Sequence, residues 1–306
     1  MQSFPKRFFI YQKERFPVLV HVPLIIAFSF SAIGFSRACR GLIDFIDWRD
    51  FLACLFTNIT LFFLLRVSDE HKDKEEDAAY RSYLPVPRGL VTLRELRIVA
   101  IILFAIATVI NIIYYPSLLP LYALMMLYLL VMRYEFFAAA WLKKHMVWYI
   151  VSHMVIIPLA DIYASAFDWQ LEGAQPSVGL LFFFGVSYLN GVVLEIGRKM
   201  RVSETEEPGV VSYTKLWGLR RAPVIWSLVL LFNFLLAWQA AVYAGYGSTA
   251  FVVLIMLFIV SVLPAFLFLR HPSRSKTKWI ELMSLVWALG MYLTLGGIPL
   301  LLQLLT

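Results

Sequence analysis

Nine long apolar runs divide this sequence, and they constrain its fold more than any other feature. A helix needs about 20 mostly apolar residues to cross a bilayer, whereas barrel strands are shorter and alternate in polarity. The runs therefore predict an all-α membrane protein, a bundle of nine transmembrane helices. They cover roughly residues 17–36, 48–67, 95–114, 116–133, 144–161, 177–197, 222–244, 249–269 and 279–304.

The composition excludes most soluble classes of protein. The 306 residues are 61% hydrophobic and 15% charged, whereas soluble domains average roughly 45–50% apolar and about 25% charged residues. The two cysteines, Cys39 and Cys54, support neither a disulfide framework nor a cysteine-based metal site. We expect residues 1–306 to form a single polytopic membrane domain.

The basic residues predict the orientation in the membrane. If the N-terminus is cytoplasmic and the C-terminus outside, all of the 27 Lys and Arg residues except Arg37, Arg40 and Arg49 fall on the cytoplasmic side. Cytoplasmic loops carry such an excess of positive charge, which explains the net charge of +7 without a nucleic-acid partner. We expect an integral membrane protein in a prokaryotic plasma membrane, although the composition also fits an organelle membrane.

Two polar segments, about 66–94 and 196–221, interrupt the apolar pattern as cytoplasmic loops. If the second predicted helix continues past the bilayer, its turn of about 100° per residue puts Asp69, Asp73 and Asp77 in one stripe, with Glu70 beside them. Stacked carboxylates repel and need cations, and Mg²⁺ commonly bridges a few carboxylates to substrate phosphates. The alternative is a solvated helix end laced with salt bridges.

The residues after this acidic stripe favour an ordered loop over a flexible linker. Pro85 and Pro87 end the helix, and Gly89 permits a sharp turn. Thr92 can then cap the next helix, with Glu95 at its third position.

The second polar segment begins with charges on one helix face. Glu195, Arg198 and Lys199 are neighbours at i, i+3 and i+4, and Arg201 follows. An ionisable residue at the membrane boundary, such as Glu195, is a functional candidate. The alternative is a simple Glu195–Lys199 surface pair.

The order of these features resembles the UbiA-type intramembrane prenyltransferase superfamily. Its members have nine helices, an N-D-x-x-D-x-x-x-D motif after helix 2, an R-P-x-x-x-G loop, and a second Asp-rich motif after helix 6 leading into G-x-x-T-x-x-x-x-x-G. Here residues 69–77 keep the spacing of the first motif, residues 84–89 resemble the loop, and Gly209 to Gly218 resembles the last stretch. The second acidic motif is not reproduced, since residues 195–201 read EIGRKMR.

The resemblance implies Mg²⁺-dependent ionisation of an allylic isoprenyl diphosphate, with transfer of the isoprenyl group to a small aromatic or lipidic acceptor at the cytoplasmic mouth of the bundle. The residues implied as Mg²⁺ ligands are Asp69, Glu70, Asp73, Asp77 and Glu195, all but Glu70 being also the main catalytic candidates. Candidates for diphosphate contacts are Arg66, Arg88, Lys143, Arg198, Lys199 and Arg201. Asn58, His153 and Asn190 are candidates for the reaction chamber, or else interhelical hydrogen-bonding residues.

Two other functions stay open at this point. A membrane terpene cyclase of the same superfamily would ionise the same diphosphate and quench the cation internally. A non-enzymatic transporter or lipid-binding protein is the further alternative, but transporter sites usually lie near the bilayer midplane, whereas these charges gather at one face.

Overall fold

The computed structural model describes residues 3–42, 44–206 and 211–299. Within these ranges the chain forms helices and connecting turns without strands. Nine helical segments of the described chain are long and apolar enough to cross a membrane. The prediction of an all-α membrane protein with nine spans is therefore confirmed.

The spans follow the predicted runs closely, and six shorter helices connect or precede them. The spans are α2 (Val18–Cys39), α3 (Trp48–Lys72), α5 (Leu93–Tyr114), η1 (Pro116–Leu118) with α6 (Leu119–Arg133), α8 (Met146–Met154) with α9 (Ile156–Trp169), α10 (Gly179–Arg198), α12 (Arg221–Tyr243), α13 (Gly247–Arg270), and α14 (Arg274–Tyr292) with η4 (Leu293–Gly297). The shorter helices are α1 (Phe4–Arg15), α4 (Lys74–Tyr80), η2 (Glu135–Phe137), α7 (Ala139–Lys144), η3 (Ser203–Thr205) and α11 (Tyr213–Trp217).

Three span boundaries differ from the prediction by more than a few residues. The second predicted run, 48–67, ends five residues early, because α3 continues to Lys72. The predicted run 144–161 ends eight residues early, because the helix continues through Asp161 and Asp168 to Trp169. Both acids are buried among polar partners, so they do not end the span. The last helix begins at Arg274 rather than at 279, and residues 300–304 of that predicted run lie outside the described residues.

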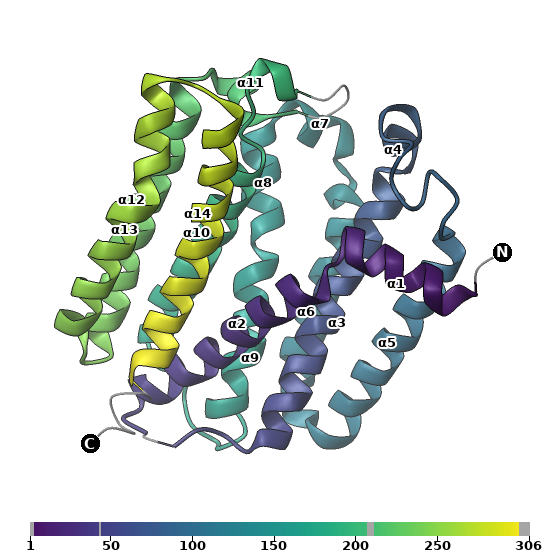
Figure 1. The fold of residues 1–306 in the computed structure, drawn as a ribbon. Helices are drawn as coiled ribbons and strands as arrows, with labels where there is room; N and C mark the ends of the chain where they lie inside the picture. Colours follow the sequence, from purple (N-terminus) through teal and green to yellow (C-terminus); the bar gives the residue numbers. More distant parts are fainter. Residues whose placement is uncertain (1–2, 43, 207–210, 300–306) are drawn as a thin grey trace.

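The helices form one bundle whose connecting elements gather at its two ends. α10 packs against α12 and α14, and α13 lies against both of these. α2 packs against α9 and α3, and α3 packs against α5 and α6. Figure 1 shows α4, α7 and α11 at one end of the bundle, which we call the loop end.

An ion-pair network ties α2 to α9 at the other end. Arg37 and Arg40 donate to the buried Asp168 carboxylate at 2.9 and 2.7 Å, and Ser36 donates to its other oxygen at 2.6 Å. Glu172 accepts from both arginines at 2.8 Å. Arg37 and Arg40, two of the three basic residues predicted to lie on the outer side, therefore stabilise the packing of the helices.

Candidate active site

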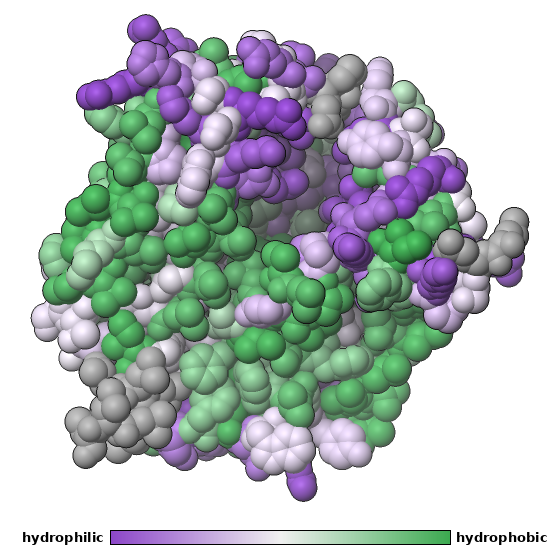
Figure 2. All heavy atoms as spheres, in the orientation of Figure 1, coloured by the Kyte–Doolittle hydropathy of each residue, from purple (hydrophilic) through white to green (hydrophobic). Residues whose placement is uncertain are grey.

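Hydrophilic side chains surround a hollow at the loop end of the bundle, above a largely apolar body (Figure 2). Charged and aromatic residues of α3, η2, α8 and α10 contact one another at this end. We call Asp69, Lys72, Glu135, Tyr149, His153, Glu195, Arg198 and Lys199 the mouth cluster. Its members come from four elements, so only the fold brings them together.

Glu195 organises the cations at the end of α10. Its side chain is buried, and it accepts from Arg198 at 2.6 Å and from Lys199 at 2.7 Å. The Tyr213 hydroxyl of α11 donates to the same carboxylate at 3.3 Å. Because Glu195 is buried and has three partners, its pairing with Lys199 is not a simple surface pair, and Glu195 holds two cations at the loop end of α10.

Tyr149 of α8 lies between two ammonium groups. The Nζ atoms of Lys72 and Lys199 lie 5.6 and 5.7 Å from its ring centroid, within the range of cation–π attraction. The other neighbour of the ring is His153, which stacks on it at 3.8 Å between centroids. One aromatic ring thus links Lys72, the last residue of α3, to Lys199, the residue that follows α10.

An unusual turn brings Glu135 into the cluster. Glu135, Phe136 and Phe137 all have φ between 51 and 58°, a left-handed conformation that costs roughly 1–2 kcal/mol per non-glycine residue. In this turn Glu135 pairs with Lys72 at 2.5 Å and lies 3.7 Å from His153 Nε2. Such strain clusters at functional sites, which makes η2 part of the candidate site.

The acidic stripe keeps its predicted spacing across a break in the helix. α3 ends at Lys72 and α4 begins at Lys74, but Asp73 N still donates to Asp69 O at 2.9 Å, and Asp77 N to Asp73 O at 2.7 Å. The Asp69 carboxylate lies close enough to Lys72 and Arg198 to interact with their charges. Within the described ranges, neither the Asp69 nor the Asp73 side chain has an ion pair or hydrogen bond of its own.

The other two acids of the stripe are bound by arginines instead. Glu70 is buried and pairs with Arg15 of α1 at 2.6 Å and with Arg66 at 3.3 Å. Asp77 is also buried and pairs with Arg81 at 2.7 Å and with Arg15 at 3.8 Å. Burial raises the pKa of the Asp77 carboxyl, against the opposing effect of Arg81. The stripe is thus divided into two free and two paired carboxylates.

The other predicted diphosphate contacts lie apart from the mouth cluster or serve local structure. Arg88 pairs with Glu14 at 2.8 Å on the surface beside α1. Lys143 is exposed on α7. Arg201 donates from its backbone to Thr214 at 2.9 Å and so orders the turn before α11.

The predicted chamber residues occupy different surroundings. Asn190 lines a cavity of about 100 Å³ between α2, α3, α9, α10 and α14, whose other walls include Phe28, Phe62 and Tyr292. Asn58 is buried and donates to Ser29 at 2.9 Å, whereas His153 belongs to the mouth cluster. Asn190 also contacts the Asn233 amide at 2.7 Å, so it serves both the cavity wall and the helix packing.

The sequence pattern did not single out Lys72, Glu135 and Tyr149 as site residues, nor Asp161 as a buried acid of the bundle. Asp161 is fully buried in α9 and accepts from Ser187, whose hydroxyl contacts that of Tyr292 at 2.9 Å. An acid within an apolar run is a recognisable signal. The other three carry no comparable signal, because their importance arises from contacts between distant segments.

The loop between α4 and α5 follows its predicted design. Thr92 and Glu95 form the expected capping box, and Gly89 has a φ of 76°, which a side chain would strain. Both predictions are confirmed. Gly209 of the later glycine motif lies outside the described residues, and Gly218 ends α11 with a φ of 88°.

Comparison with known proteins agrees with this architecture. The sequence profile described as the UbiA prenyltransferase family matches residues 27–289. The chain belongs to the UbiA prenyltransferase family. It is therefore an integral membrane protein and a prenyltransferase of the UbiA type, for which a prenyl diphosphate substrate and Mg²⁺ are general family properties.

A solved structure supports the same fold. The structure, described as a digeranylgeranylglyceryl phosphate synthase in membranes, superposes with a TM-score of 0.60 at 16% sequence identity. The match covers 95% of this chain and 99% of that one. Among curated protein sequences none matches this UbiA chain.

Proposed function

We propose that the protein transfers an isoprenyl group from an allylic isoprenyl diphosphate to a small aromatic or lipidic acceptor at the mouth cluster. The observation that carries this proposal is the approach of the free Asp69 carboxylate to Lys72 of α3 and Arg198 of α10, with the equally free Asp73 one helical turn further along the stripe. Such an arrangement suits a metal-bound diphosphate. The loop end then faces the cytoplasm, as the basic residues predict, in a prokaryotic plasma membrane.

The donor set fits Mg²⁺ bound jointly by protein and substrate. Within the part of the chain that the structure describes, no three His, Cys, Asp or Glu side chains form a group that could hold a metal ion. Mg²⁺ does not require such a group, because it is usually bound by one or two carboxylates, several waters and substrate phosphates. Asp69 and Asp73 would hold it, and when bound it would neutralise charge on the leaving diphosphate.

Lys72, Arg198 and Lys199 would neutralise the remaining negative charge of the diphosphate. Glu195 holds Arg198 and Lys199 in place, at 2.6 and 2.7 Å, and so acts as a positioning residue. Preorganised cations stabilise developing negative charge without reorganising during the reaction. We infer that this basic cluster takes the place of the second acidic motif, which the sequence lacks.

The apolar substrate chain requires a path into the bundle. The cavity lined by Phe28, Phe62 and Tyr292 is bounded in part by α3 and α10, two of the helices that also carry the mouth cluster. Aromatic faces stabilise a nearby cation, so these rings suit an allylic carbocation formed when the diphosphate leaves. Asn190 lines the same cavity, and we assign to it the role of orienting an acceptor.

The proposal is tested with protein in lipid nanodiscs, Mg²⁺, and geranyl, farnesyl or geranylgeranyl diphosphate. Pyrophosphate release and mass spectrometry of the organic extract are followed without an acceptor and then across an acceptor panel. We expect acceptor-dependent release that Asp73→Asn abolishes and that Glu75→Gln, an exposed acid of α4, leaves intact. A cyclic product formed without acceptor would contradict the transfer reaction in favour of a cyclase.

The basic cluster has its own test. Arg198→Gln combined with Lys199→Gln should abolish binding of a non-hydrolysable farnesyl diphosphate analogue, while Lys143→Gln should not change it. Unchanged affinity in the double variant would refute the role assigned to these two cations.

A further inference from the structure

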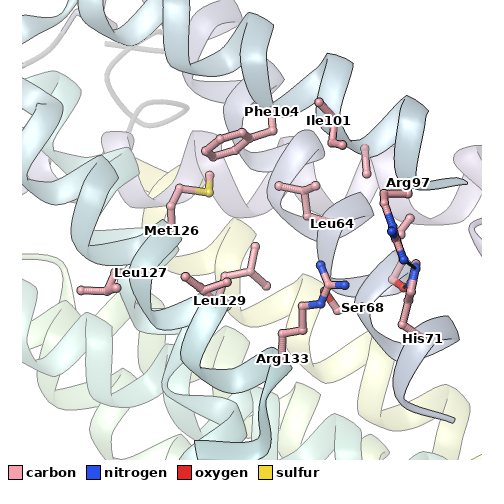
Figure 3. Close-up of a pocket in the computed structure, with 13 residues that line it drawn as sticks. Leu64, Ser68, His71, Arg97, Ile101, Phe104, Met126, Leu127, Leu129 and Arg133 are labelled. Carbon is pink, nitrogen blue, oxygen red and sulfur yellow. Dashed lines mark hydrogen bonds between the residues drawn. The ribbon is translucent and has the colours of Figure 1, made fainter. Parts of the chain in front are cut away.

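A groove lies between α3, α5 and α6, apart from the candidate active site. The groove has a volume of about 520 Å³, and none of the mouth cluster lines it. Its apolar walls include Leu64 of α3, Ile101 and Phe104 of α5, and Met126 of α6 (Figure 3). Leu130 of α6 also lines it. Ile101 and Leu130 are 58% and 50% exposed, so the groove opens sideways onto the membrane-facing surface of the bundle.

One end of this groove is basic. Arg97 of α5 and Arg133 of α6 lie there beside His71 of α3 (Figure 3), and Arg97 Nη2 is 3.4 Å from His71 Nε2. No acidic side chain is among the described residues that line the groove. Arg97 lies about one turn inside α5 and Arg133 is the last residue of α6, so both residues lie near the loop end of their spans, where lipid headgroups would be expected.

We propose that this groove binds one anionic glycerophospholipid of the surrounding bilayer. One acyl chain would lie along the apolar walls, and the phosphate would bind Arg97 and Arg133. Arginine suits phosphate because its planar donors form paired hydrogen bonds, and basic pockets between transmembrane helices bind anionic headgroups. The groove opens to the hydrocarbon region, where acyl chains are already concentrated, and this favours a bilayer lipid as the occupant.

This site is independent of the proposed reaction. The prenyl diphosphate is assigned to cations of the mouth cluster, whereas the groove has cations of its own on α5 and α6. A lipid in the groove would instead fasten α5 and α6 to α3. If no lipid binds the groove, the proposed reaction is not affected. If the proposed reaction is wrong, lipid binding in the groove can still be tested.

The test counts lipids bound to delipidated, detergent-solubilised protein by native mass spectrometry. Phosphatidylglycerol and phosphatidylcholine are titrated separately, since only the first carries a net negative charge. We expect one tightly held phosphatidylglycerol, with a preference over phosphatidylcholine. Arg97→Gln combined with Arg133→Gln should weaken phosphatidylglycerol binding at least tenfold. Arg94→Gln, an exposed arginine of the same helix outside the groove, should leave it unchanged.

A second variant tests the apolar part of the groove. Leu127 lines the groove and is 59% exposed, so Leu127→Trp should block the acyl chain and weaken binding without lowering the melting temperature of the lipid-free protein. Wild-type binding in both the double arginine variant and Leu127→Trp would overturn the proposal. Equal affinity for both lipids would also overturn it, as would stoichiometric displacement of phosphatidylglycerol by farnesyl diphosphate, which would give the groove to the substrate.

Discussion

Replacing Arg15 by Gln tests the division of the acidic stripe, because Arg15 of α1 holds two of its members. The side chains of Glu70 and Asp77 are 1% and 2% exposed, and that of Arg15 is 14% exposed. Removing one partner of a buried ion pair costs roughly 3–5 kcal/mol. Glu70 retains Arg66 at 3.3 Å and Asp77 retains Arg81 at 2.7 Å, so we expect a smaller loss, about 2–3 kcal/mol.

The assay is the apparent melting temperature in nanodiscs, followed by tryptophan fluorescence. A loss of this size should lower the melting temperature of a 306-residue chain by about 3–5 °C. Lys13→Gln is the matched control, since Lys13 is an exposed cation of the same helix. The Mg²⁺ requirement of the remaining activity should not change, because Arg15 contacts neither Asp69 nor Asp73. If Arg15→Gln melts within about 1 °C of the control, the assignment of Glu70 and Asp77 to the fold is refuted.

Three further predictions concern other parts of the chain. The hydrogen bond from Arg37 lowers the pKa of the Glu172 carboxyl, so this ion pair stabilises the fold fully above about pH 4.5 and loses its effect as the pH falls through the lowered pKa. On acidification to about pH 3, the melting temperature of the wild type should therefore fall more than that of Glu172→Gln. Equal decreases in the two proteins would contradict this prediction. Tyr149→Leu should raise the KM for the prenyl diphosphate several-fold, because it removes the aromatic ring that two lysines face. Tyr149→Phe keeps the ring and should have a KM near that of the wild type. Equal KM values for the two variants would exclude the cation–π role. Gly296→Ala should lower the free energy of unfolding by about 1–3 kcal/mol, measured by thermal melting, because the added Cβ would overlap the Ser31 backbone. Gly297→Ala is the control, since a Cβ at this position would meet no neighbouring atom, and it should melt like the wild type.

The sequence predicted what depends on local patterns. Apolar runs of sufficient length specify membrane helices because the bilayer requires every backbone group to be satisfied within the helix, so nine spans followed directly. The capping box of Thr92 and Glu95 was equally local. The even spacing of Asp69, Asp73 and Asp77 also survives in the structure, through backbone hydrogen bonds across the helix break.

The partners of these residues could not be predicted in the same way. A helical wheel shows which side chains share a face but not which neighbour covers that face. Arg15 reaches Glu70 across 55 positions of sequence, and no local pattern connects them. The left-handed turn at Glu135 is similarly hidden, because non-glycine residues rarely adopt it and only the surrounding packing can impose it.

The length of the fifth span shows a different limit. Asp161 and Asp168 interrupt the apolar run and made it look shorter than it is. Asp161 accepts a hydrogen bond from Ser187 of α10, and Asp168 pairs with Arg37 of α2 and with Arg40, the residue that follows α2. Polar groups within a membrane helix are tolerated when other helices supply their partners, and those partners are visible only in the folded bundle.

The central claim is that Asp69 and Asp73 are the carboxylates free to bind Mg²⁺, whereas Glu70 belongs to the fold. The most direct measurement is the Mg²⁺ dependence of pyrophosphate release, normalised to folded protein, for Asp69→Asn, Asp73→Asn and Glu70→Gln. We predict that either aspartate variant abolishes release or greatly raises the Mg²⁺ concentration needed for half-maximal release. Glu70→Gln should lower the melting temperature and leave the Mg²⁺ dependence at the wild-type value. An unchanged Mg²⁺ dependence in both aspartate variants, or a shift in Glu70→Gln as large as theirs, would contradict the claim.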